Sequence, residues 1–442
     1  MTRITIVGAG SSFTLGLLGD LYRVNDLWGS ELVLYDINEE SLEVMNKIVT
    51  RYVERTGVDL KVFATTNKIE ALENTDFAII TIRAWGAEAL KRFLSIPLRH
   101  GVAQVVGDTV GPSGILKGLF EIPAVLDIAR TLEDVSPHAL MINFTNPMTA
   151  ICTAVQRGTK IRVVGLCHEI HQIRRLASRL LDLDIEKIIP EAGGINHLTW
   201  ATSLKYGDEE IMDDFKEAVL KGKRWSVIEA HPYIVGRQLL MLYGHPPVSS
   251  DRHISEFFHY LYEWFRDPKI GPILRSVSMY IDYEKKTLSE QWIKMRNRMW
   301  ERLKRIARGE EEIELWPAHE AAMDIISSIV NNKRRELLAI NVPNDGYIDG
   351  IPKDYVVEVP GVVDGNGVRG RRIGRLSKPA TAILNLHLEK FELLVKGILE
   401  EDKYLVLQAM AIDPLTPSPE KAKVILDEFL EESKDLLSIS LK

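Results

Sequence analysis

Short apolar runs alternate with longer amphipathic stretches through the first part of the chain. A run such as Arg3-Ile4-Thr5-Ile6-Val7 is typical of a strand buried in a parallel sheet whose two faces are covered by helices. We predict such strands at 3–7, 31–35, 60–65, 77–81, 139–144 and 161–166. The amphipathic stretches predict helices at 38–55, 115–132 and 170–183.

This alternation ends near residue 190. Residues 198–207 have the pattern of an antiparallel strand, and strand-like runs return at 338–346 and 355–360. Helices with charged outer faces are expected at 209–221, 255–266, 285–308, 377–400 and 418–437. The pattern predicts an α/β protein with a Rossmann-type parallel sheet in residues 1–190 and an α+β domain in residues 191–442.

The turn after the first strand has features of a dinucleotide site. Gly8 permits a tight turn, Gly10 lets the backbone approach a pyrophosphate, and the helix that starts after Ser11 offers free N–H groups. Phe13 stands where the usual fingerprint has a third glycine. Asp36, at the end of the second strand, suits ribose hydroxyls and repels a 2′-phosphate, which favours NAD over NADP. The alternative is a glycine turn in an unrelated α/β protein, with Asp36 capping a helix.

Polar residues also follow later strands of the predicted sheet. Arg83 can neutralise a phosphate or a substrate anion, or it can be a surface cation, and the sequence does not decide between these. Asn143 and Asn146 can hydrogen-bond sugar hydroxyls or the nicotinamide ribose. The glycine-rich stretch 104–114 is typical of a loop that closes over a substrate, an ordinary long turn being the alternative.

The strand at 161–166 ends in Cys167-His168-Glu169, and His197 follows later in a Gly-Gly-Ile-Asn-His turn. One thiolate and one imidazole suit a borderline divalent metal such as Mn, Fe, Co, Ni or Zn. We expect the N-terminus of the next helix to hold Cys167 as a thiolate. His171 is a rival ligand, and the alternative interpretation of Cys167 is a small buried apolar residue.

Composition narrows the class of protein. The 442 residues are 45% hydrophobic and 26% charged, as in a soluble globular enzyme. The net charge of −7 argues against nucleic-acid binding, and no apolar run is long enough for a membrane span. Two cysteines and the absence of a signal-peptide pattern predict a cytoplasmic protein. The arginines at 369, 371 and 372 would suit a carboxylate-bearing substrate if they, or Arg92, faced the pocket; a solvated patch is the alternative.

Together these motifs resemble glycoside hydrolase family 4, the NAD- and metal-dependent glycosidases, along nearly the whole chain. The resemblance implies a fold similar to the lactate and malate dehydrogenases, with an added substrate and oligomerisation domain. We therefore expect a homodimer or homotetramer. The motifs that carry the resemblance are Gly8-Ala9-Gly10-Ser11, Asp36, Gly107-Asp108-Thr109 with Gly111-Pro112, Asn143-Phe144-Thr145-Asn146-Pro147, Cys167-His168-Glu169, Gly194-Ile195-Asn196-His197, Asn341-x-Pro343-Asn344, Val357-Glu358-Val359-Pro360 and Asp413-Pro414-Leu415.

The resemblance also implies roles for individual residues. Cys167 and His197 would bind Mn²⁺, and Asn146 would contact the metal-bound sugar. The triplet Cys-His-Glu is similar to that of members acting on uronic acids, so we expect an α-galacturonide or α-glucuronide, with Glu169 and Arg83 facing the substrate. Cys-His-Ser and related triplets are similar to those of neutral α-galactosidases and α-glucosidases, which remain the alternative.

The chemistry implied by the resemblance departs from the two-carboxylate scheme of most glycosidases. NAD⁺ takes a hydride from C3, the metal polarises the ketone and acidifies C2–H, and a base removes that proton. The glycosidic oxygen is eliminated, water adds, and NADH returns the hydride. The candidate base is Asp251, for which helix capping is the alternative role, and the candidate acid is Asp108 or His168.

Two other functions fit parts of the sequence. A 2-hydroxyacid dehydrogenase would use the same fold, but it needs a His-Asp pair and a substrate arginine, needs no metal, and is commonly shorter. An NAD-bound regulatory protein with a dead site is a third interpretation, against which the intact Cys167, His197 and Asn146 argue.

Overall fold

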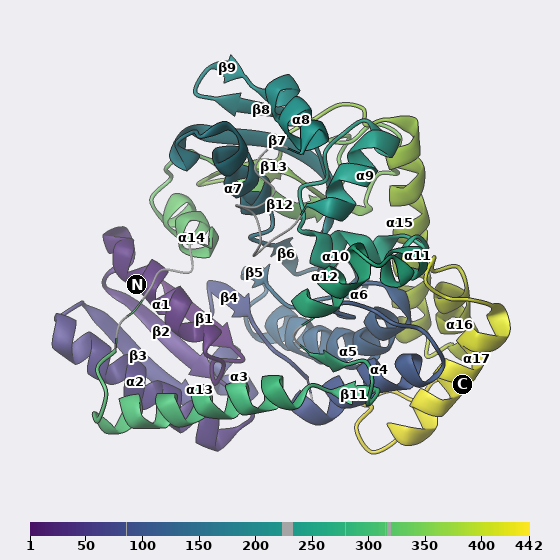
Figure 1. Ribbon diagram of the computed structural model, residues 1–442. Coiled ribbons are helices and arrows are strands. Elements are labelled where there is room, and N and C mark those ends of the chain that lie inside the picture. Colours follow the sequence, from purple (N-terminus) through teal and green to yellow (C-terminus); the bar gives the residue numbers. More distant parts are fainter. Residues whose placement is uncertain (85, 223–232, 279, 314, 316–319) are drawn as a thin grey trace.

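A parallel sheet forms the N-terminal part of the protein, as the computed structural model in Figure 1 shows. The structure describes residues 1–84, 86–222, 233–278, 280–313, 315 and 320–442. The parallel strands lie in the order β3-β2-β1-β4-β5-β6, with each predicted strand present to within two residues. They are β1 (Arg3–Val7), β2 (Ser30–Tyr35), β3 (Leu60–Thr65), β4 (Phe77–Ile80), β5 (Leu140–Asn143) and β6 (Arg162–Gly165).

Helices connect these strands, as expected for a parallel sheet. Those predicted above are α1 (Phe13–Arg23), α2 (Glu39–Thr56), α5 (Gly111–Val135) and α7 (Ile170–Leu181). The other helices of this part are α3 (Lys68–Leu72), α4 (Gly86–Arg99) and α6 (Met148–Gly158). Helix α5 begins four residues before the prediction, so the end of the expected 104–114 loop is helical. The cause is a distant partner, because the Gly111 N–H donates to the Asp413 carboxylate at 2.9 Å, and Pro112 suits the first helical turn.

The second part of the chain extends the same sheet with antiparallel strands. Strand β12 (Arg335–Pro343) pairs with β6, and the order continues through β13 (Val356–Asp364), β7 (Ile188–Ile195), β8 (Leu198–Tyr206) and β9 (Glu209–Glu210), with β14 (Gly367–Gly370) beside β13. The antiparallel strand predicted at 198–207 is confirmed. The division at residue 190 falls inside β7, and it stays a prediction.

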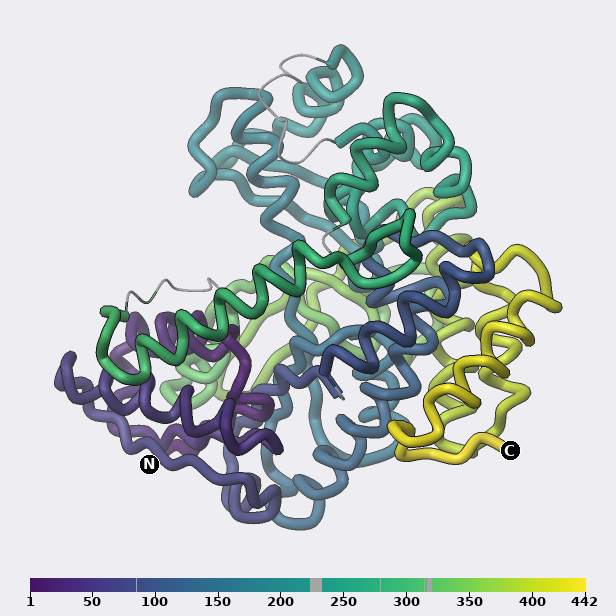
Figure 2. The backbone as a smooth tube through the Cα atoms, turned by 60° about the horizontal axis from the view of Figure 1, so that its bottom comes forward, coloured from purple at the N-terminus to yellow at the C-terminus, as the bar shows by residue number. Residues whose placement is uncertain are grey.

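Helices surround this second part. They are α8 (Met212–Lys221), α9 (Ile234–Tyr243), α10 (Asp251–Ile254), α11 (Leu261–Arg266), α12 (Ile270–Val277), α13 (Glu290–Arg308), α14 (Ala322–Val330), α15 (Lys378–Leu399), α16 (Lys403–Ala411) and α17 (Pro419–Glu432). The helix predicted at 255–266 is instead a 3-10 turn, Ser255–Phe257, followed by α11. Figure 2 shows α13 crossing back to the N-terminal part, where the Arg51 guanidinium of α2 donates to the Ile306 carbonyl at 2.7 Å.

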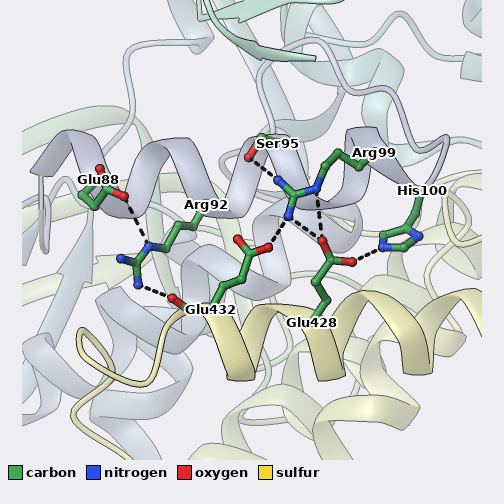
Figure 3. A network of polar contacts seen from close by, with 7 residues as sticks. All are labelled: Glu88, Arg92, Ser95, Arg99, His100, Glu428 and Glu432. Atoms are coloured by element: carbon green, nitrogen blue, oxygen red, sulfur yellow. Dashed lines mark hydrogen bonds and ion pairs between the residues drawn. The ribbon is translucent and has the colours of Figure 1, made fainter. Parts of the chain in front are cut away.

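The arginines proposed for a substrate carboxylate are engaged elsewhere. Figure 3 shows Arg92 and Arg99 of α4 facing the acidic side of α17, and Arg92 also donates to Asp435 at 2.6 Å. Arg99 donates to Glu428 and Glu432 at 2.5 and 2.6 Å. This network fixes the C-terminal helix on α4, because Arg99 binds two glutamates of α17 and Arg92 binds Asp435, which follows that helix. In the same way the other three arginines pair with surface acids: Arg369 with Asp364, Arg371 with Glu191 and Arg372 with Asp349.

Among the described residues, no helix combines the length and the apolar character needed to cross a membrane.

Candidate active site

Several strands end at one edge of the sheet, and the residues that follow them gather there. Gly8 follows β1, Arg83 lies after β4, Asn146 after β5 and Cys167 after β6. The turn between β7 and β8 returns His197 to this edge, with a φ of 66°. The Sγ of Cys167 lies 3.5 Å from Nε2 of His197. The two predicted metal ligands are therefore neighbours in space.

The separation of these two atoms suits a shared divalent cation. For zinc, bonds of about 2.3 Å to sulfur and about 2.1 Å to nitrogen at a tetrahedral angle place the two atoms about 3.6 Å apart. The rival ligand His171 lies on α7, where its Nδ1 accepts a hydrogen bond from Arg174 at 2.9 Å. Geometry therefore favours His197 over His171.

The neighbours of His197 select the tautomer that binds a metal. The hydroxyl of Thr109 donates its one proton to Asp108 at 2.7 Å, so it can only accept from Nδ1 of His197, 3.1 Å away. Nε2 is then the unprotonated nitrogen, and it is the atom that faces Cys167. Burial lowers the pKa of His197 to about 3, with a further lowering from His253, so the ring is neutral near pH 7.

His253 is a site residue that sequence reasoning missed. Asp108, His197 and His253 each offer one ligand atom, and these atoms all lie within 4.8 Å of one another. The centroids of the two imidazole rings are 4.0 Å apart. The only signal in the sequence was the closeness of His253 to Asp251, which does not distinguish a ligand from a surface histidine. His197 thus belongs both to this group and to the pair with Cys167, and thiolate, imidazole and carboxylate are donors that suit a divalent transition metal.

The expected thiolate at Cys167 is not supported in the metal-free chain. Burial raises the pKa of Cys167 well above its ordinary value, and the carboxylates of Glu358 and Glu169 raise it further. These effects outweigh the hydrogen bonds from the Glu169 backbone and the Asn196 side chain, which lower the pKa of the thiol. A bound dication would add the positive charge that the thiolate lacks.

Asp108 is placed to accept hydrogen bonds. Its two oxygens accept from Thr109 at 2.7 Å and from Nδ2 of Asn146 at 3.5 Å. Burial raises its pKa, but Lys117 and the imidazoles of His253 and His197 outweigh burial and bring the pKa well below the usual range. An ionised carboxylate cannot donate a proton, so this state differs from the predicted acid and suits a ligand or an acceptor.

The other members of the triplet at Cys167 already have partners. Glu169 accepts from the backbone N–H and the hydroxyl of Ser250 at 2.9 and 3.1 Å. Burial raises the pKa of Glu169, yet nearby imidazoles and Ser250 bring it to about 2. Nδ1 of His168 lies 3.4 Å from Glu320, and the hydrogen bond to that buried carboxylate raises the pKa of His168. His168 is more than half exposed, so it can still reach a ligand.

Asp251 has a different environment from that of the predicted base. Its carboxylate accepts from the backbone N–H groups of Val235 and Gly236 at 3.0 and 2.8 Å, at the start of α9. Burial raises its pKa to about 7, against the lowering by these bonds. Both oxygens are therefore engaged by a helix N-terminus, and the helix is not the one that its sequence position suggested.

We expect Asp251→Ala to lower the free energy of unfolding by about 1–2 kcal/mol, because it removes the acceptor at the start of α9. Asp251→Asn keeps one acceptor oxygen and should lose less. Urea denaturation of both variants measures the effect. A catalytic base predicts another pattern, a loss of kcat of about 10²- to 10⁴-fold in both variants with unchanged stability, and that pattern would contradict the capping role.

The predicted NAD turn has space for backbone only. Gly8 has a φ of 88°, and a Cβ there would lie 2.9 Å from the backbone of Thr81. A Cβ at Gly10 would lie 2.6 Å from the Cβ of Ser41. Asp36 accepts from the Gly10 N–H at 2.8 Å, so it also shapes the turn. This cradle at the start of α1, which includes Ser11, fits a pyrophosphate.

Asn143, in contrast, does not face a cofactor. It is fully buried, and its amide donates to the carbonyl of Thr145 while its oxygen accepts from the Thr145 N–H, at 3.0 and 3.1 Å. The side chain closes the backbone loop that presents Asn146. The sequence could not separate the two asparagines, because both follow the same strand.

Glu256 is a second residue that the sequence did not reveal. Its carboxylate accepts from the backbone N–H groups of Val106 and Gly107 at 2.5 and 3.1 Å. It thereby attaches the segment that carries Asp108 to the segment that carries His253. Burial raises its pKa to about 8 against these bonds. The partners are 150 residues apart, so no local pattern signals the contact.

The fold and the site together define an enzyme of Rossmann type with side chains arranged for a divalent metal. The model of the family 4 glycosyl hydrolases matches residues 3–183, and that of their C-terminal domain matches residues 192–416. The chain belongs to glycoside hydrolase family 4. The predicted family and enzyme class, a glycosidase, are confirmed, and the hydroxyacid dehydrogenase alternative is set aside.

Relatives and solved structures agree with this assignment. An α-galacturonidase of Thermoanaerobacterium saccharolyticum is 30% identical over 462 residues, covering 98% of this chain and 96% of its own. An α-glucosidase of Erwinia rhapontici is 28% identical over 458 residues, covering 99% of each chain. A 6-phospho-α-glucosidase from gut microorganisms, solved with NAD and Mn²⁺, has a TM-score of 0.82 at 23% identity, covering 100% of each chain. Malate dehydrogenase of Plasmodium falciparum, with a TM-score of 0.52 at 12% identity over 92% of this chain and 100% of its own, shares the fold, so the predicted fold class is confirmed.

Proposed function

We propose that this protein hydrolyses α-glycosides of a uronic acid, an α-galacturonide or an α-glucuronide, by reversible oxidation of the sugar. Family 4 membership makes it a glycosidase that depends on NAD and a divalent metal. The substrate class and the order of chemical steps are the proposal. The observation that carries it is the contact of Cys167 with His197 at 3.5 Å, at the same sheet edge as the Gly8 turn.

The residues present fit both cofactors. Cys167 and His197 would hold the metal, and Asp108 and His253 offer ligand atoms beside His197. The Gly8-Ala9-Gly10-Ser11 turn and Asp36 would hold the dinucleotide. When bound, NAD⁺ supplies reversible hydride removal at C3, and the metal supplies Lewis-acid polarisation that acidifies C2–H before elimination.

The chain itself orients these groups. Thr109 presents the metal-binding tautomer of His197 and directs one oxygen of Asp108. The other oxygen of Asp108 lies beside Asn146, whose amide can donate to a sugar hydroxyl. His168, held by Glu320 at the exposed end of the site, is the remaining candidate proton donor. Positioning of this kind lowers the barrier because the groups are already in place.

Three observations support an acidic sugar. The triplet Cys167-His168-Glu169 is similar to that of uronide-cleaving members, and an α-galacturonidase is among the 30%-identical relatives. Glu169 has its partner in Ser250, so it does not need a substrate hydroxyl. Arg83 is exposed, and within the described ranges no ion pair holds its guanidinium. A free guanidinium suits a carboxylate.

Nitrophenyl glycosides test this substrate class. With NAD⁺, Mn²⁺ and reductant present, we expect nitrophenol release from the α-galacturonide or α-glucuronide, without net NADH. One charge-assisted hydrogen bond is worth about 1.5–3 kcal/mol, which predicts a preference over the neutral α-glycosides of about 10- to 100-fold in kcat/KM. Arg83→Ala should remove most of that preference. Faster release from the neutral α-glucoside or α-galactoside would replace the proposal with the neutral glycosidase.

We also propose that the protein acts in the cytoplasm as a homodimer or homotetramer. Its two cysteines are free thiols, which fits a reducing compartment. Met241 and Leu242 of α9 are 69% and 59% exposed, so this helix offers apolar surface for a second subunit. Light scattering coupled to size exclusion should show a single species of two or four chains.

A further inference from the structure

Glu358 lies where the parallel and antiparallel halves of the sheet meet. It is in the middle of β13 and is only 2% exposed. In register it faces Asn341 of β12 on one side and Gly194 of β7 on the other. Asn341 in turn faces Gly165, the last residue of β6 before the Cys167 segment. The carboxylate is therefore buried between the two chain segments that supply the metal pair.

Three donors surround this carboxylate. One oxygen accepts from Nδ2 of Asn341 at 2.9 Å and from Nδ2 of Asn196 at 3.3 Å. The other accepts from the hydroxyl of Thr199 at 3.0 Å. Asn341 comes from β12, Asn196 and Thr199 come from the β7–β8 hairpin, and all three are buried. A carboxylate offers an acceptor oxygen on each side, so it can accept from all three of these donors at once.

Asn196 connects Glu358 to both metal ligands. It immediately precedes His197 in the turn, so its position and that of the imidazole are coupled through one peptide unit. Its side-chain amide also hydrogen-bonds the Cys167 thiol. The Oδ1 of Asn196 is buried and has no hydrogen-bond partner among the described residues. The orientation of this amide is thus set by its two N–H contacts, to Glu358 and to the sulfur.

We propose that Glu358 is a positioning residue of the metal centre, which acts by holding Asn196 so that the amide fixes the Cys167 sulfur opposite His197. The inference rests on the proposed function, since it needs Cys167 and His197 to be the ligands. Residues that hydrogen-bond the ligands of a metal orient those ligands, and losing such a residue typically weakens metal affinity about 10- to 100-fold. Glu358 touches neither the substrate nor the metal.

The test compares Co²⁺ binding by the wild type, Glu358→Gln and Asn196→Ala. Co²⁺ bound to a thiolate has a sulfur-to-metal absorption band, which reports the Cys167 bond without any turnover. Glu358→Gln removes the carboxylate charge and replaces one of its two acceptor oxygens by an NH₂ group, so the hydrogen bond that holds Asn196 weakens. We therefore expect Kd for Co²⁺ to rise about 10- to 100-fold and the band to shift. Asn196→Ala should match it. NAD binding should stay as in the wild type.

Two controls separate positioning from general structure. Glu191→Gln changes a partly exposed glutamate of β7 in the same way, and it should bind Co²⁺ as the wild type does. Thr199→Val removes one contact to Glu358 and the contact of the same hydroxyl to the Ile195 carbonyl at 3.1 Å. It keeps the contact between Glu358 and Asn196, so it should also keep wild-type affinity. If Thr199→Val weakens binding as much as Glu358→Gln does, the carboxylate acts by tying strands together, and the inference is overturned.

The outcomes distinguish this inference from the proposed function. A wild type without the band, or a band that persists in Cys167→Ser, contradicts the metal site itself. A wild type with the band, together with Glu358→Gln and Asn196→Ala that bind Co²⁺ equally well, overturns the role of Glu358 alone. If Glu358→Gln fails to fold, Asn196→Ala decides the question, because it leaves the contacts of Glu358 to Asn341 and Thr199 in place.

Discussion

Replacing Cys167 by serine should reduce glycosidase activity by about 10³-fold or more, because metal polarisation is worth several kcal/mol and each 1.4 kcal/mol is tenfold in rate. A neutral hydroxyl is a poor substitute for a thiolate at a borderline divalent metal. NAD binding should remain, since the glycine turn follows β1 and Cys167 follows β6. The measurements are nitrophenol release with Mn²⁺ and the Kd for NAD⁺.

The second cysteine supplies the matched control. Cys152 is buried in α6, where the amide of Asn143 lies 4.0 Å from its sulfur. Burial raises the pKa of its thiol to about 12, so it stays protonated and does not compete for metal. Cys152→Ala should retain activity within a few-fold of wild type. If Cys167→Ser keeps its activity, the assignment of Cys167 as a metal ligand is refuted, whatever the activity of Cys152→Ala.

Replacing Lys390 by methionine should lower the free energy of unfolding by about 3–5 kcal/mol, the usual effect of leaving a buried charge without its partner. Lys390 of α15 and Asp413 form an ion pair at 2.8 Å, and both side chains are fully buried. Asp413 also accepts from the Gly111 N–H at the start of α5, so the variant should disturb the approach to Asp108 as well. Chemical denaturation measures the loss.

A double variant tests the cause of this destabilisation. Lys390→Met combined with Asp413→Asn removes both charges and keeps an oxygen that can accept from Gly111. It should recover a substantial part of the lost stability, because neutral replacement of a buried pair is often tolerated. The single variant Asp413→Asn completes the comparison. If the loss of stability in the double variant equals the sum of the losses in the two single variants, the two charges are not coupled, contrary to their contact at 2.8 Å.

The parallel half of the fold and the contact between Cys167 and His197 were accessible from the sequence because their signals are local. A buried parallel strand appears in the sequence as a continuous apolar run. Strand β3, for example, was predicted at its observed bounds, Leu60–Thr65. The residues after such strands must meet at one edge, which is why Cys167 and Arg83 could be placed at the site. His197 was found through its glycine-rich turn, whose φ of 66° shows the unusual backbone.

The rest of the site depends on contacts between distant segments. Asn143 and Asn146 follow the same strand, but only Asn146 is free of the loop closure that engages Asn143. Asp251 binds the start of α9, to which no sequence neighbour relates it. Arg92 lost its predicted role to Asp435, a residue near the end of the chain. In each case a polar side chain that could have acted in the site is engaged by a hydrogen-bond or ion-pair partner that only the folded structure reveals.

The roles of Glu358 and Asp413 also depend on contacts between distant segments, so the sequence did not reveal them. Both belong to motifs that mark the family, yet neither motif indicates a chemical role by its residue type. The structure places the carboxylate of Glu358 against Asn196, next to His197, and the carboxylate of Asp413 at the start of α5. Both carboxylates are buried, and each acts by fixing the position of another group, Asn196 for Glu358 and the Gly111 N–H for Asp413.

Anomalous X-ray diffraction from crystals grown with Mn²⁺ and NAD⁺ tests the central claim most directly. We predict one anomalous peak within bonding distance of the Cys167 sulfur and Nε2 of His197, beside a nicotinamide ring bound at the same sheet edge. A manganese peak away from these two atoms, or a nicotinamide bound far from that peak, would contradict the account.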